Sequence, residues 1–226
     1  MALLRIRTSP SAMLAMEIVS VALLALAMAA YPGGTQWRHA ADGHDFWRNY
    51  LCDLARRVAL NGTPNPVGSA LAQASMLALA LGLVPFWRLL PDFFGARPRL
   101  GTWVRVLGQV AVAASFAVVL LPADRFSEVH GLAIVVAGVP GLFAALLAVV
   151  GLAGEERSPR VVASVGVTAL LVAAAAFAVY LRQFFVPGPG PVAGAILERL
   201  ALILLLVWMG AVAFRAPHSA EPREIG

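Results

Sequence analysis

The sequence predicts an all-α, polytopic membrane protein, and three observations carry this prediction. The chain of 226 residues is 60% hydrophobic and has a mean hydropathy of +0.81. Only 13% of its residues are charged, whereas soluble domains carry about 25% charged residues. Apolar stretches of about twenty residues, the length of helix that crosses a bilayer, recur along the whole chain. We therefore expect a single integral membrane domain over residues 1–226.

Six apolar stretches, bounded by charged and turn-forming residues, are long enough to span the membrane. They are Ser11–Tyr31, Val67–Leu90, Trp103–Leu121, Val129–Ala153, Val161–Arg182 and Ala193–Phe214. The connections between them are short, except for Pro32–Pro66. An even number of spans places both chain ends on the same side of the membrane.

The arginines favour one orientation of these spans. All 17 basic residues are arginine; ten lie on the side of the chain ends and seven on the other side. The positive-inside rule then predicts a multi-pass protein of the cell (plasma) membrane with both termini cytoplasmic. A competing interpretation is a cleaved signal peptide, because Arg5 and Arg7 precede an apolar stretch and the small residues Ala27-Met28-Ala29. Glu17 interrupts that stretch and favours an uncleaved span.

The charge also limits the expected partners. A net charge of +5 fits arginines that lie at anionic lipid surfaces. Membrane lipids are therefore the expected partners, nucleic acid is not, and the sequence names no protein partner. The single cysteine, Cys52, excludes an intramolecular disulfide.

The long connection contains an unusually polar segment, His44–Ala59. At about 100° per residue, its larger apolar side chains fall within an arc of about 140°, and its polar side chains lie opposite. This pattern predicts an amphipathic helix that lies on the outer surface of the bundle like a lid. The spacings Asp45–Arg48, Asp53–Arg56 and Asp53–Arg57 also fit ordinary surface ion pairs, so a purely structural helix is the alternative.

The sixth span is too short unless it includes charged residues. Leu200–Phe214 corresponds to about 22 Å of helix, whereas the hydrocarbon layer is about 30 Å thick. The span must therefore take Glu198 and Arg199 partly into the outer edge of the membrane. There they either face an internal cavity as a pair, or Arg199 reaches outward to the headgroups. Near the cytoplasmic edge, Glu17 is expected to pair with Arg88 or Arg105.

Polar residues from other segments converge on the same predicted side. His130 begins the fourth span, Asp124 precedes it, and Arg182 closes the fifth span. Four segments that are separated in sequence thus contribute to one membrane boundary, which predicts an outward-facing polar pocket. The residues assigned to this pocket are Asp45, Arg48, Asn49, Asp53, Asn65, Asp124, His130, Arg182, Glu198 and Arg199.

Several short motifs resemble a known family. They are Phe46-Trp-Arg-Asn-Tyr-Leu-Cys-Asp53, then Asn65-Pro66, Pro122-x-Asp124 and His130-Gly131. They are similar to the bacterial domain-of-unknown-function family 998 and, more distantly, to the Frag/DRAM/Sfk group. The resemblance implies six membrane-spanning helices and a polar outer site at Asp53, Asn65, Asp124 and His130, but no particular reaction. Cys52 departs from the pattern, because a small Ser is expected there.

Three classes of function stay open. In the first, the pocket binds or modifies a lipid headgroup: His130 acts as a base, oriented by Asp53 or Asp124, and Arg182 or Arg199 holds a lipid phosphate. No nucleophile motif accompanies these residues, and no cofactor or metal is expected, because the histidine spacing fits no standard zinc pattern. The second class is a non-catalytic scaffold that binds lipid or a protein partner. The third, a small-solute transporter, is poorly supported, because few ionisable groups lie in mid-membrane.

Overall fold

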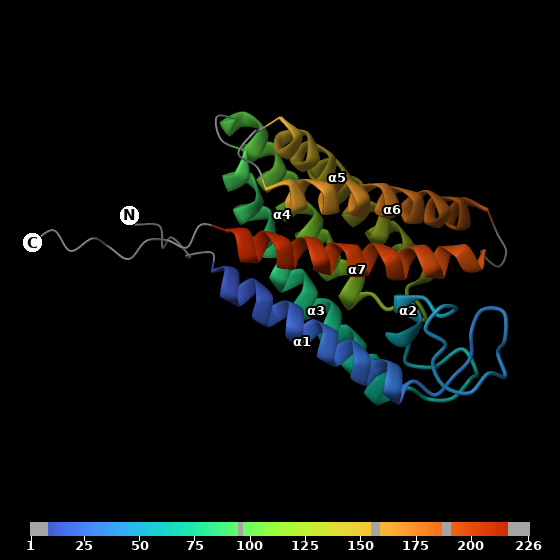
Figure 1. Cartoon of the computed structure of the whole chain (residues 1–226). Helices are drawn as coiled ribbons and strands as arrows, with labels where there is room; N and C mark the ends of the chain where they lie inside the picture. Colours follow the sequence, from blue (N-terminus) through green and yellow to red (C-terminus); the bar gives the residue numbers. More distant parts are fainter. Residues whose placement is uncertain (1–8, 95–96, 155–158, 187–190, 217–226) are drawn as a thin grey trace, which may run out of the picture.

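The computed structural model describes residues 9–94, 97–154, 159–186 and 191–216, which form a helical bundle (Figure 1). Two elements are short: α2 (Leu51–Leu54), a single helical turn, and the 3-10 turn η1 (Leu90–Phe93). Within the described residues there is no β-strand, only two isolated bridges, Gly33–Asp42 and Val58–Pro64. The six long helices are α1 (Pro10–Ala30), α3 (Pro66–Leu89), α4 (Pro98–Leu120), α5 (Ser127–Ala153), α6 (Arg160–Phe185) and α7 (Val192–Arg215).

The six predicted spans are confirmed, because each of these six helices is long and apolar enough to cross a membrane. The chain is therefore a multi-pass, all-α membrane protein. The helix ends lie within a few residues of the predicted ends, and the largest difference is α4, which begins at Pro98 rather than at Trp103. Proline needs no hydrogen-bond partner in the first helical turn and its backbone angle suits that position, so α3 and α4 both begin at a proline.

Successive long helices run in opposite directions, and α1 packs on α3, α4 on α5, and α6 on α7 (Figure 1). Residues 31–65 join α1 to α3 and contain α2; we call them the long loop. This loop lies beside the ends of α6 and α7 that are farthest from the chain termini (Figure 1). We call that end of the bundle the long-loop end.

Large side chains gather in the half of the bundle farther from the long loop. Trp208 of α7 meets Phe86 and Trp87 of α3 edge to face, with ring centroids 5.2 and 6.4 Å apart. Gly108 allows α4 to approach α3 closely, because a Cβ at this position would lie 2.3 Å from the Trp87 ring of α3. Aromatic packing thus fills this half of the bundle.

The amphipathic helix predicted over His44–Ala59 is wrong, because the helical part of this segment is only the turn Leu51–Leu54. Asp45 Oδ1 accepts the backbone N–H groups of Trp47 and Arg48 at 3.0 and 3.1 Å. Asp53 Oδ2 accepts the N–H of Tyr50 at 2.8 Å, and the Tyr50 backbone is extended. The two aspartates therefore start two separate turns through local hydrogen bonds, which compete with a continuous helix.

The ion pairs predicted from sequence spacing have mixed outcomes. The exposed Asp45–Arg48 pair is confirmed at 2.9 Å. The alternative pairs of Asp53 with Arg56 or Arg57 are wrong, because its carboxylate accepts from Asn49 and from the Tyr50 backbone instead. The pairing of Glu17 is also wrong: Arg105 binds Asp92 at 3.0 Å, and the buried Oε2 of Glu17 has no hydrogen-bond partner.

The alternating helices place Asp42 in the long loop and Arg99 in the first turn of α4 at opposite ends of the bundle, and both are exposed. We therefore expect that a membrane-impermeant maleimide added to intact cells labels only one of the variants Asp42→Cys and Arg99→Cys, each made in a Cys52→Ser background. Gel-shift detection of the label measures this. Labelling of both positions from outside would contradict the arrangement of the six spans.

Candidate functional site

Arg199 of α7 anchors the long loop to the bundle. Its side chain is 1% exposed. Nε donates to the Phe46 carbonyl at 3.1 Å, and Nη2 donates to the Asn49 carbonyl at 2.9 Å and to Nε2 of His44 at 3.3 Å. The guanidinium also lies over the Phe46 ring, 5.5 Å from its centroid. Arg199 therefore does not reach outward to headgroups; two main-chain carbonyls of the loop and the His44 ring accept its hydrogen bonds inside the protein.

A set of buried amide and carboxylate groups holds the loop in shape above this arginine. Asn49 is 0% exposed and donates from Nδ2 to the Gly34 carbonyl at 2.8 Å. Gly34 has a φ of 88°, in the left-handed region that glycine tolerates, and a Cβ there would meet Leu60 and Asn61. Nδ2 of Asn49 also lies 3.4 Å from Oδ2 of Asp53. These bonds fix the turn that carries Cys52 and Asp53.

Asn65 fixes the other end of the loop. Its Nδ2 donates to the carbonyls of Leu54 and Arg56 at 3.0 and 2.9 Å, and Ser69 Oγ donates to the Ala55 carbonyl at 2.7 Å. The chain after α2 is therefore attached to the first turn of α3. In the structure Asn65 orders the loop, and it does not line either of the cavities described below.

His130 faces the only cysteine of the chain. Its Nδ1 lies 2.6 Å from the Leu121 carbonyl and its Nε2 lies 3.3 Å from Cys52 Sγ. A carbonyl oxygen only accepts, so Nδ1 carries the proton and Nε2 presents a lone pair to the thiol. The predicted orientation of His130 by Asp53 or Asp124 is wrong, since the Leu121 carbonyl fills that role. Asp124 instead accepts the backbone N–H of Arg57 at 2.8 Å.

A polar cavity of about 490 Å³ lies under the long loop, at the long-loop ends of α5, α6 and α7. Tyr50 and Gln183 close part of its wall, because the Tyr50 hydroxyl donates to Gln183 Oε1 at 3.1 Å. Its polar lining residues are Gln36, Tyr50, Cys52, Asp53, Arg56, Ser127, His130, Tyr180, Gln183 and Glu198.

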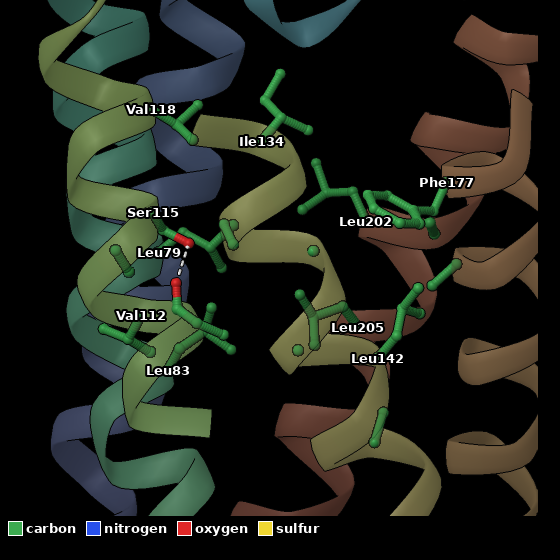
Figure 2. Close-up of a pocket in the computed structure, with 18 of the residues that line it drawn as sticks. Leu79, Leu83, Val112, Ser115, Val118, Ile134, Leu142, Phe177, Leu202 and Leu205 are labelled. Atoms are coloured by element: carbon green, nitrogen blue, oxygen red, sulfur yellow. Dashed lines mark hydrogen bonds between the residues drawn. The ribbon is translucent and has the colours of Figure 1, made fainter. Parts of the chain in front are cut away.

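An apolar cavity of about 450 Å³ continues into the bundle. Figure 2 shows its walls, with Leu79, Leu83 and Val112 on one side and Leu142 and Leu205 across from them. It reaches Trp87 and Trp208 in the aromatic half of the bundle. The residues that line both cavities are Cys52, Ile134, Ala173, Phe177, Glu198 and Ala201. Cys52 and Glu198 therefore stand where the polar space meets the apolar space.

Burial sets the protonation of the loop groups at this boundary. It raises the pKa of the Cys52 thiol, and the negative charges of Glu198 and Asp53 add to the increase, while the positive charge of Arg199 opposes it. Burial likewise raises the pKa of Asp53, against the hydrogen bonds from Tyr50 and Asn49 that lower it. The thiol is consequently protonated at neutral pH, with His130 as its acceptor.

The structure brings only part of the predicted pocket together. Asp53, His130 and Glu198 line the polar cavity, and Arg199 supports it through the loop. Glu198 accepts the backbone N–H of Leu51 at 2.8 Å and lies 4.0 Å from Nη1 of Arg199. Six of the assigned residues lie elsewhere: Asp45 and Arg48 form a surface pair, Arg182 is exposed, Asn49 and Asn65 hold the loop, and Asp124 binds the Arg57 backbone.

Several lining residues were not assigned from the sequence. Cys52 departs from the family motif, Arg56 is expected only in a surface ion pair, and Gln36 and Gln183 carry no sequence signal. Tyr50 lies in the segment His44–Ala59, which is predicted to form a surface helix. Cys52 could have been assigned to the site because it directly precedes Asp53, a residue that was assigned. The two are adjacent in the turn α2, and both line the polar cavity.

Within the described part of the chain, no three His, Cys, Asp or Glu side chains lie close enough to hold a metal ion. No family model matches the chain, and neither a curated protein nor a solved structure matches it. The resemblance to family 998 therefore stays a prediction, and the function has to be argued from the site itself.

We expect Arg199→Met to destabilise the protein by about 3–5 kcal/mol, because it leaves buried loop carbonyls without a donor and Glu198 without its cation. Arg215→Met is the matched control, since Arg215 is exposed at the far end of the same helix. Unfolding in mixed detergent micelles, read by tryptophan fluorescence, measures both. Equal stability of the two variants would show that Arg199 is not the anchor.

The attachment of the loop should weaken in acid. Burial and the nearby charge of Arg199 together lower the pKa of His44 from 6.5 to about 4, against the opposing effect of Asp45. Because the released loop binds a proton more readily than the docked loop, stabilisation by neutral His44 is complete above pH 6.5 and is lost as the pH falls towards about 4. Amide hydrogen exchange of residues 44–53 measures the loss. The variant His44→Gln accepts a hydrogen bond at every pH and should flatten the profile; an unchanged profile would refute the role of His44.

Proposed function

We propose that this membrane protein binds a membrane lipid, with the headgroup in the polar cavity and an acyl chain in the apolar cavity. The observation that carries this proposal is the shared boundary of the two cavities at Cys52 and Glu198. A membrane lipid has the same order of polar and apolar parts. Each cavity falls in the range of roughly 300–1,000 Å³ that is typical of ligand sites.

The depth of the apolar cavity supports an acyl chain as its occupant. Glu198 and Trp208 both line it, and they lie about 15 Å apart along α7. This is about half of the 30 Å hydrocarbon layer, so the cavity matches the depth of one leaflet. The lining is largely aliphatic and aromatic, which suits a hydrocarbon chain and does not suit a hydrated ion.

The side chains that line the polar cavity suit a lipid headgroup. Arg56 offers a cation for a phosphate, and Gln36, Gln183 and His130 offer neutral hydrogen-bonding groups. Asp45, Arg48 and Arg182 lie outside both cavities, so we assign them no role in lipid binding.

The experiment compares Ala173→Phe with Ala174→Phe. Ala173 lines both cavities, whereas its neighbour Ala174 on α6 is exposed on the outside of the helix. We expect a phenylalanine at 173 to fill the shared boundary and to reduce co-purifying phospholipid by about tenfold or more, which corresponds to about 1.4 kcal/mol. Native mass spectrometry and lipid extraction of the purified proteins measure this.

The variant Ala174→Phe should retain the lipid content of the wild type. A wild-type protein that carries no lipid after gentle purification, or an Ala173→Phe variant that carries as much as the control, would overturn the proposal. Gly141→Leu, which narrows the apolar cavity from α5, is the second variant if Ala173→Phe fails to fold.

We also propose that the chain lies in the plasma membrane with both termini in the cytoplasm, on the basis of the arginine distribution. Asp42→Cys should then be the position that external maleimide labels in intact cells, and Arg99→Cys should react only after permeabilisation. The reverse pattern would place the polar cavity on the cytoplasmic side.

A further inference from the structure

The boundary between the two cavities holds a thiol and an imidazole in a reactive arrangement. Cys52 Sγ lies 3.3 Å from His130 Nε2, and the bond from Nδ1 to the Leu121 carbonyl leaves Nε2 free to accept the thiol proton. His130 is 6% exposed, so water competes little for its lone pair. A nucleophile and a base in hydrogen-bond contact, with the base oriented by a third group, are the parts that covalent catalysis requires.

The position of the thiol selects the bond it can attack. In an acyl lipid the ester carbonyl lies between the polar headgroup and the hydrocarbon chain. Cys52 lines both cavities, so it occupies the corresponding position in the protein. A lipid bound as proposed above would therefore bring its ester carbonyl to the sulfur.

A buried donor lies near the same boundary. Nη1 of Arg199 has no hydrogen-bond partner, although the side chain is 1% exposed. It lies 4.0 Å from Oε2 of Glu198, which lines both cavities, and the charge of Arg199 acts on the Cys52 thiol. A buried N–H donor without an acceptor is costly unless a ligand or reaction intermediate uses it. The negative oxygen that forms when a thiol attacks an ester is such a group.

We propose that Cys52 is the nucleophile of an acyl transfer from an ester lipid and that His130 is its base; this rests on the proposed lipid site. Sγ attacks the ester carbonyl carbon while His130 Nε2 takes the thiol proton. The tetrahedral intermediate then breaks its bond to the alcohol oxygen, and the imidazolium returns the proton to that oxygen. The products are an acyl thioester on Cys52 and a lipid with a free hydroxyl group. A hydroxyl of water or of a second lipid then takes the acyl group, and the thiol regains its proton.

The test follows the thioester directly. The purified full-length protein is incubated with vesicles of phosphatidylethanolamine and phosphatidylglycerol whose acyl chains carry a terminal alkyne. The labelled protein is coupled to a fluorophore, separated on a gel and analysed by intact mass. We expect one acyl group per chain on the Cys52 peptide, removed by neutral hydroxylamine. Heat-denatured wild type should acquire no label.

Two variants and one control separate chemistry from folding. Cys52→Ser should lose the hydroxylamine-sensitive label, and His130→Gln should slow its formation by about 10²–10⁴-fold, the usual contribution of a general base. Glu128→Gln, exposed in the first turn of the same helix, should label like the wild type. An equal rate of labelling in His130→Gln and Glu128→Gln, or equal labelling of Cys52→Ser, would overturn the proposal.

The outcomes also separate this proposal from the lipid site on which it rests. Lipid that co-purifies with the wild type without any thioester at Cys52 would overturn acyl transfer and leave lipid binding supported. Absence of both lipid and thioester would overturn both proposals. A thioester that forms in the wild type and in Ala174→Phe but not in Ala173→Phe would support both.

Discussion

A single buried guanidinium determines how the long loop lies on the bundle. Arg199 sits within a membrane-spanning helix, where an unsatisfied charge would be expensive. Its donors are met mainly by carbonyls of Phe46 and Asn49, which belong to a segment about 150 residues earlier in the chain. The loop must therefore fold over the end of α7. Because Cys52 follows Asn49 by three residues, the same attachment places the thiol against His130.

The spans and this buried charge were predictable, and the loop was not. Hydropathy identifies a membrane helix without tertiary information, and the length of Leu200–Phe214 forced Arg199 into the span. The predicted helix over 44–59 is wrong because Asp45 and Asp53 accept nearby backbone N–H groups. The spacing of apolar residues carries no information about such local hydrogen bonds. The prediction for Arg182 is wrong for another reason. Adjacent residues on a helix point in directions about 100° apart, so Gln183 lines the polar cavity while Arg182 faces the surface.

Small residues on membrane helices usually permit close packing, and in this structure they have two roles. Gly166 of α6 has the packing role, because a Cβ there would lie 2.7 Å from the Trp208 ring. Ala173 and Ala201 instead line both cavities. The aromatic cluster around Trp208 packs α7 against α3 at the end far from the long loop. Sequence alone does not separate these roles, since both use the same residue types.

In the proposed acyl transfer, the orientation of His130 by a main-chain carbonyl favours a thiol over a hydroxyl as the nucleophile. In a Ser-His-Asp triad the carboxylate stabilises the imidazolium that forms when the base takes a proton. Here the Leu121 carbonyl offers only a dipole, and the nearest acids bind backbone N–H groups instead. A weaker base requires a nucleophile that gives up its proton more easily, and in the same buried surroundings a thiol is more acidic and more nucleophilic than a serine hydroxyl. A serine at position 52 would keep the hydrogen bond to Nε2 and would still lack sufficient activation, so the cysteine is the chemically consistent partner of this histidine.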